Sequence, residues 1–119
     1  MIETIRLSEK GKKQLTQVKR KTGIEQWNTL CRWALCMSLA EPSIPPIEEI
    51  PADSNVEMTW KTFAGQFGEA YEALIRQRII DDELSAEDMS IWFRLHLHRG
   101  ISYLAKSNDI SIFVDFFEK

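Results

Sequence analysis

Residues 25–40 are expected to form a helix that is apolar around most of its circumference. Its apolar residues, in chain order, are Trp27, Leu30, Cys31, Trp33, Ala34, Leu35, Cys36, Met37 and Leu39. A helix that is apolar on nearly all sides has to be buried on nearly all sides. A chain of 119 residues has the length of one domain, and one small domain can hardly surround a helix completely. We therefore expect part of this helix to contact another subunit.

The residues before this helix predict a strand, a helix and a tight turn. Residues 2–7 alternate, with Ile5 and Leu7 on one side, which indicates a short strand. A frayed, extended terminus is the alternative. If the strand forms, its simplest partner is the same strand of another subunit. Ser8 can cap a following helix, and Gly23 can supply the left-handed position that ends it. We expect Ile5, Leu7, Gly23, Trp27 and Trp33 to lie at the interface of a homo-oligomer, either a dimer or a tetramer.

Positive charge is concentrated at the start of the chain. Residues 1–40 hold eight Lys and Arg against three acidic residues, a net +5, although the whole chain has a net charge of −3. Such asymmetry indicates a polyanionic partner. A narrow apolar stripe (Gly11, Leu15, Val18 and Thr22) leaves the opposite face of the first helix polar, and Lys19 flanks the stripe. We predict that the residues contacting DNA phosphates are Lys10, Lys13, Gln17, Lys19, Arg20 and Lys21. A solvated lysine face without function is the alternative.

The rest of the chain predicts a mainly helical protein. Residues 41–58 contain all four prolines and are expected to form an irregular connector. A third helix should run from a cap at Thr59 to about residue 80, with Gly65 and Gly68 allowing close packing of helices. A fourth should begin near Ser85 and end near Lys106, and a short last helix should follow Asp109. We interpret residues 1–119 as one domain with a basic part (1–40), the connector (41–58) and an acidic helical part (59–119).

No catalytic motif is visible in the sequence. His96 and His98 point about 200° apart on a helix and cannot hold one metal ion. We expect His96 to be a core or interface histidine whose ring is hydrogen bonded. Cys31 and Cys36 point about 140° apart and cannot form a disulfide with each other, which favours a reduced, cytoplasmic protein. The acidic residues at 81–83 and 87–88 could bind Mg²⁺. Their position at helix ends favours a capping role instead.

The strand, basic helix, glycine turn and apolar helix together resemble the ribbon-helix-helix arrangement, in which paired strands and two helices build an intertwined dimer. The segments 19–23 with Trp27, 31–34, 41–46 and 98–104 more specifically resemble the DndE family of bacterial DNA sulfur-modification proteins. The resemblance covers essentially the whole chain.

The resemblance implies an accessory protein of DNA phosphorothioation, the replacement of a non-bridging phosphate oxygen by sulfur. It implies binding of duplex DNA, including nicked DNA, by a homo-oligomer that works beside other proteins of the sulfur-modification complex. It implies no catalytic residue, and we expect no enzyme activity, no metal, no cofactor and no membrane association.

Two alternatives to this function stay open. The first is a metal-dependent DNA nickase that uses Asp81, Asp82 and Glu83 or Asp88. The second is an adaptor whose basic helix binds an acidic protein of the complex.

Overall fold

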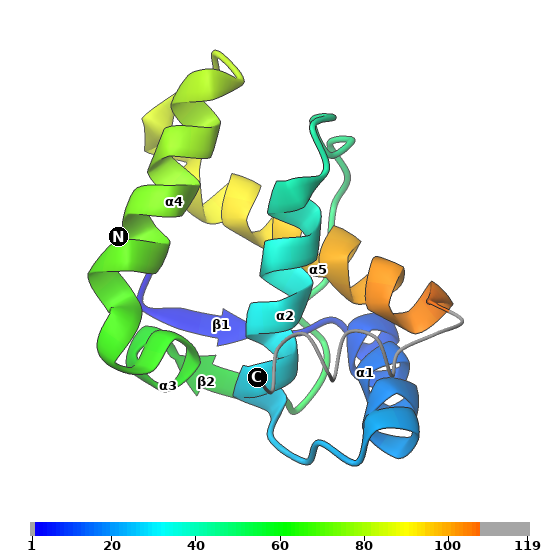
Figure 1. Ribbon diagram of the computed structural model, residues 1–119. Coiled ribbons are helices and arrows are strands. Elements are labelled where there is room, and N and C mark those ends of the chain that lie inside the picture. Colours follow the sequence, from blue (N-terminus) through cyan, green and yellow to red (C-terminus); the bar gives the residue numbers. More distant parts are fainter. Residues whose placement is uncertain (1, 108–119) are drawn as a thin grey trace.

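The computed structural model describes residues 2–107, which form a helical body with one small sheet (Figure 1). The elements are β1 (Thr4–Arg6), α1 (Glu9–Thr22), α2 (Trp27–Ala40), β2 (Glu57–Thr59), α3 (Trp60–Ala64), the 3-10 helix η1 (Gly65–Phe67), α4 (Gly68–Asp81), the 3-10 helix η2 (Ala86–Asp88) and α5 (Met89–Lys106). The mainly helical fold, with its strand-helix-turn-helix start and irregular connector, is confirmed. The last helix, expected after Asp109, lies outside the described residues.

The N-terminal strand is real, but its partner lies in the same chain. β1 pairs antiparallel with β2, with Ile5 opposite Met58. The pairing continues beyond the strands, where the Leu7 N–H donates to the Val56 carbonyl over 3.0 Å. The expectation that β1 pairs with the same strand of another subunit is therefore wrong. The end of the connector returns to cover this strand edge.

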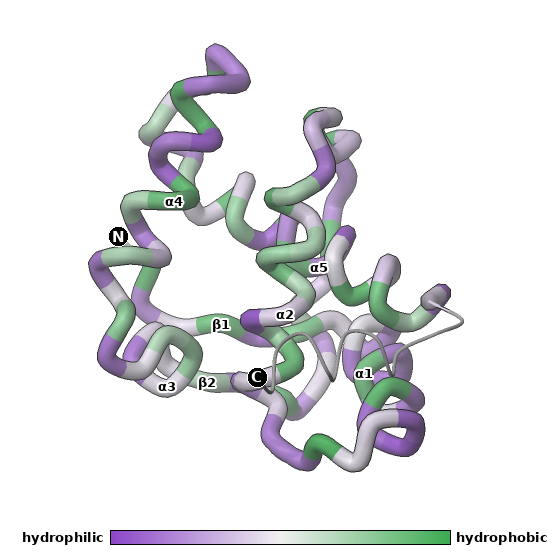
Figure 2. Tube along the Cα trace, viewed as in Figure 1, coloured by the Kyte–Doolittle hydropathy of each residue, from purple (hydrophilic) through white to green (hydrophobic). Residues whose placement is uncertain are grey.

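Helix α1 begins and ends at the expected residues. The Ser8 hydroxyl accepts from the Gly11 N–H over 3.0 Å, which satisfies one of the free donors of the first turn. Gly23 has a φ of 76° and its N–H donates to the Lys19 carbonyl, as a left-handed helix end requires. Gly11, Leu15 and Val18 are buried, and hydrophilic and hydrophobic residues alternate around α1 in Figure 2. The narrow apolar stripe is confirmed.

Helix α2 is largely covered by its own chain. Six of its residues are buried, and α5 and α3 pack against it. Gly100 of α5 allows this packing, because a Cβ there would overlap the main chain of Ala34. One chain thus covers more of α2 than the sequence led us to expect, since α5, far along the chain, lies directly across it (Figure 1).

The third helix is interrupted at Gly65. Residue 65 has a φ of 59°, and a Cβ there would meet nothing within 4 Å. A Cβ on Gly68 would touch only the indole of Trp60. The expectation that both glycines allow close packing of helices is therefore wrong for Gly65, whereas Gly68 of α4 does lie close to the Trp60 side chain of α3. Gly65 is needed for its left-handed conformation, which separates α3 from α4. The cap at Thr59 is confirmed by its bond from the Thr62 N–H.

Among the helices between residues 2 and 107, none combines the length and the hydropathy that crossing a membrane would need.

Candidate nucleic-acid interface

The outer face of α1 carries a group of exposed cations. Lys10, Lys13, Arg20 and Lys21 are exposed, as is Gln17. Between residues 2 and 107 these four cations form no hydrogen bond and no ion pair. The spacing 10, 13, 17, 20, 21 places them on one side of the helix. Their ammonium and guanidinium groups are therefore available to an external anion.

Lys19 differs from the other predicted contacts. Its side chain is half-buried, and Nζ lies 3.5 Å from the centroid of the Trp27 ring. A cation over an aromatic face is attracted by the ring's quadrupole. Lys12, on the same flank, donates to Asn55 Oδ1 over 2.6 Å. These two lysines extend the positive surface from the exposed face toward β2 and the start of α2.

An acidic segment borders the opposite flank of α1. Glu48, Glu49 and Asp53 of the connector line a cleft that also contains Lys10 and His98. Asp53 accepts from the Glu9 N–H over 2.7 Å. Lys10 therefore lies where the cationic face meets negative charge, whereas Lys13, Arg20 and Lys21 lie away from this cleft. The electrostatically strongest part of the face is its middle and C-terminal half.

The five residues expected at a subunit interface have different environments. Ile5, Leu7 and Trp33 are buried within the single chain, Trp27 is half-buried and Gly23 is exposed. Burial inside the chain leaves Ile5, Leu7 and Trp33 little surface for a second subunit. Assembly itself stays a prediction.

The two histidines are neutral, hydrogen-bonded parts of the body. His96 is buried, and its Nδ1 lies 2.8 Å from Ser38 Oγ. Burial, followed by the charges of Arg78 and Arg99, lowers the pKa of His96 to about 4. The expectation of a buried, hydrogen-bonded His96 is confirmed. Both ring nitrogens of His98 are also bonded, since Nε2 accepts from the Ser8 N–H and Nδ1 donates to the Arg94 carbonyl.

The cysteines and the acidic cluster offer no clear reactive group. Both thiols are free, and burial raises the pKa of Cys31 to about 12, with Arg32 opposing the shift. Asp82 pairs with Arg78 over 2.8 Å, and each side chain of this pair is only 12% exposed. Asp81 accepts from Gln77. In the described part of the chain, no three His, Cys, Asp or Glu side chains are grouped to hold a metal ion.

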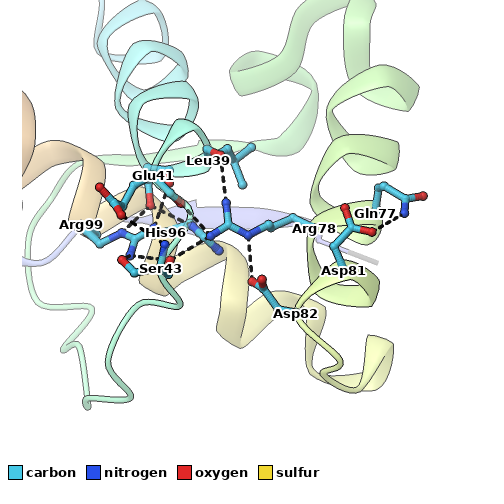
Figure 3. A network of polar contacts seen from close by, with 10 residues as sticks. Leu39, Glu41, Ser43, Gln77, Arg78, Asp81, Asp82, His96 and Arg99 are labelled. Atoms are coloured by element: carbon cyan, nitrogen blue, oxygen red, sulfur yellow. Dashed lines mark hydrogen bonds and ion pairs between the residues drawn. The ribbon is translucent and has the colours of Figure 1, made fainter.

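Sequence reasoning missed two arginines that bind the end of α2. Arg78, from α4, donates to the carbonyls of Leu39, Glu41 and Ser43 at 2.8–2.9 Å. Arg99, from α5, donates to Ser38 and to the Ser43 carbonyl. Figure 3 shows the two guanidinium groups reaching these acceptors from different helices.

A third arginine also donates to main-chain carbonyls, further along the connector. Arg94 donates to the carbonyls of Ile50, Pro51 and Arg6. The acceptors of all three arginines are mainly main-chain carbonyls, which have no sequence signature. Arg78, Arg94 and Arg99 are therefore engaged within the chain and contribute little to an external anion site.

The described residues thus define a small helical protein with one strongly cationic helix face. The model of the family "DNA sulphur modification protein DndE" matches residues 4–111, and the chain belongs to this DndE family.

Two solved structures superimpose on most of this chain. DndE from Escherichia coli B7A, described as involved in DNA phosphorothioation modification, superimposes with a TM-score of 0.71 at 22% identity, covering 87% of this chain and 98% of that one. A DndE mutant with two glycines changed to lysine, described as involved in DNA phosphorothioation, gives a TM-score of 0.68 at 19% identity over 90% and 100% of the two chains. These structures share the fold of this chain. A comparison with curated protein sequences gives no match.

Proposed function

We propose that this DndE-family protein binds duplex DNA, including nicked DNA, through the cationic face of α1 in a homo-oligomer, as a non-enzymatic accessory of the sulfur-modification complex. The observation that carries the proposal is the set of four exposed cations on one helix face, Lys10, Lys13, Arg20 and Lys21, without partners among residues 2–107. DNA presents a regular row of phosphates, which is the polyanion such a face fits. Membership of a DNA-modification family supports DNA over other polyanions.

Binding through phosphates has a measurable salt signature. Each contact releases condensed counterion, so log K falls with log salt by about 0.9 per contact. Two subunits with three contacts each would give a slope of about −5. A nick should help binding if the DNA has to bend, because an interrupted strand lowers the bending cost.

The direct test is charge reversal on the face. We expect Lys13→Glu with Lys21→Glu to weaken binding to every duplex sequence and to make the salt slope shallower. Folding should be unaffected, because both side chains are exposed. The matched control is Lys61→Glu, on α3, an exposed lysine outside the face. Wild-type affinity and slope in the double variant would overturn the proposal.

Two other assays separate this proposal from its alternatives. Binding of purified protein to DNA without other proteins distinguishes it from an adaptor that needs an acidic partner. Incubating supercoiled DNA with Mg²⁺ or Mn²⁺ tests for a nickase. Asp81→Ala and Glu83→Ala are the better probes, because both residues are exposed, whereas Asp82 neutralises Arg78 and its loss would disturb the fold. Nicking that either variant abolishes would favour the enzyme.

A further inference from the structure

A cleft of about 480 Å³ opens beside the basic helix, between the starts of α2 and α3 and the end of the connector. It is lined by Lys12, Glu25, Gln26, Trp27, Asn28, Asn55, Val56, Glu57, Met58 and Thr62. Small-molecule sites commonly occupy roughly 300–1,000 Å³ and combine an apolar surface with a few polar groups. This cleft has both features, since an indole and a methionine lie beside three side-chain amides.

The indole of Trp27 is the principal apolar surface of the cleft. It is half-buried, and among residues 2–107 the group in contact with its ring face is the ammonium of Lys19, 3.5 Å from the ring centroid. Lys19 sits on a flexible stem and can leave the ring for a phosphate. Bases stack on exposed aromatic rings in proteins that bind unpaired nucleic acid.

The amides around the indole have unused hydrogen-bonding groups. Asn28 Nδ2 donates to the Thr62 carbonyl, and Asn55 Oδ1 accepts from Lys12. Within residues 2–107 the Asn28 Oδ1, the Asn55 Nδ2 and the side-chain amide of Gln26 make no hydrogen bond. The Asn28 oxygen can therefore accept a hydrogen bond from the edge of a ligand, the Asn55 nitrogen can donate one, and the Gln26 amide can do both.

The charges of the cleft disfavour a phosphate inside it. Glu25 and Glu57 line the cleft with one cation, Lys12, and Glu57 pairs with Arg6 over 3.1 Å. Carboxylates repel phosphate but accept hydrogen bonds from the amino groups of bases. The ligand that fits is an uncharged, planar heterocycle with donors and acceptors on its edge.

The cleft adjoins the proposed DNA surface. By helical periodicity Lys12 and Lys19 lie on the flank of α1 next to Lys13 and Arg20, so positive charge continues from the exposed face to the rim of the cleft. We propose that the cleft takes one unstacked nucleobase of the bound DNA, with Trp27 as the stacking surface. This inference rests on the proposed function. It adds that the group recognised at an interrupted or distorted duplex is an unstacked base.

The test compares two duplexes of equal length by fluorescence anisotropy at fixed salt. One is fully paired, and the other carries a single unpaired 2-aminopurine. We expect wild type to favour the unpaired base by roughly tenfold and to quench its fluorescence. Trp27→Leu, which keeps apolar bulk but cannot stack, should abolish both effects while leaving the paired duplex bound as before. Trp27→Phe should retain part of the preference.

The controls separate this inference from the proposed function. Lys13→Glu with Lys21→Glu should weaken both duplexes alike and leave their affinity ratio unchanged. An unchanged ratio in Trp27→Leu, or no preference in wild type, would overturn the inference. The proposed function alone would be overturned by two results together. The protein would fail to bind the paired duplex, and it would bind a single-stranded 2-aminopurine oligonucleotide in a manner that depends on Trp27.

Discussion

Gly100 of α5 lies against the main chain of Ala34 in α2, where any side chain at position 100 would overlap the Ala34 carbonyl. The neighbouring atoms are backbone and cannot rotate away. We expect Gly100→Ala to force the two helices apart and to lower the free energy of unfolding by about 3 kcal/mol. Urea unfolding measures this change. Ser90→Ala, at an exposed position of the same helix, is the control and should change stability by about 0.5 kcal/mol or less.

The local parts of this fold follow from sequence, whereas the close approach at Gly100 does not. Ser8, Gly23 and Thr59 act through neighbours within four residues, so their roles as helix caps can be recognised from residue type and spacing. Gly65, Gly68 and Gly100 look alike in a helical pattern. Only the tertiary crossing of α2 and α5 shows that Gly100 is the one needed for packing.

The pairing of segments far apart in the chain could not be predicted from the sequence either. β1 and β2 are three-residue strands more than fifty residues apart, and so short a strand carries no information about its partner. For the candidate site, helical periodicity correctly placed the exposed cations of α1. It could not show that Lys19 covers Trp27, or that Trp27 lines a cleft with Asn55, because both depend on how α1, α2 and the connector come together.

The guanidinium of Arg78 should contribute much more stability than that of Arg76, the other arginine of α4. It bonds three main-chain carbonyls and the nearly buried Asp82. Arg78→Met leaves that carboxylate without its partner, so we expect a loss of about 3 kcal/mol or more. Arg76→Met is the matched control on the same helix, because Arg76 is 52% exposed and, within residues 2–107, pairs only with Glu72. Its effect should stay below about 1 kcal/mol. Equal effects in urea unfolding would contradict the assigned role of Arg78.

Stability should fall on mild acidification because of the two histidines. Burial lowers the pKa of His98, like that of His96, to about 4 from an ordinary value of 6.5. Between pH 6.5 and about 4 the unfolded chain therefore binds protons that the native chain does not. The contribution of the two histidines to the free energy of unfolding is fully present above pH 6.5 and is lost as the pH falls toward about 4. Each histidine accounts for up to about 1.4 kcal/mol per pH unit in this window.

The measurement is urea unfolding at pH 7.5, 6 and 5, in wild type and in a variant with His96→Gln and His98→Gln. The variant should be less stable at pH 7.5, because it loses the bonds of both rings to Ser38 and to Ser8. Its stability should nevertheless vary less between pH 7.5 and 5. An equally steep dependence would mean that carboxylates, and not these histidines, set the acid sensitivity.

The two thiols should differ in reactivity in the native protein. Cys31 is fully buried with its pKa raised to about 12, so almost none of it is thiolate at pH 8. Cys36 is half-buried with a pKa raised mainly by burial. We expect a thiol reagent at pH 8 to label Cys36 slowly and Cys31 only after unfolding in urea. Rapid labelling of both in the native state, located by peptide mass spectrometry, would contradict this packing.

Helix α4 is the surface on which we expect subunits to meet. Only Ile75 and Ile79 of its fourteen residues are buried, and it stands at one side of the body in Figure 1. Leu74 on this helix and Phe67, the last residue of η1 directly before it, are 54% and 57% exposed. Large apolar side chains grouped on a surface mark association sites.

Light scattering at micromolar concentration should show a homo-oligomer, and Leu74→Glu with Phe67→Glu should lower its mass. Ile47→Glu, on the connector and 79% exposed, should leave the mass unchanged. A wild-type monomer would refute assembly, and an unchanged mass in the double variant would place the interface elsewhere than α4.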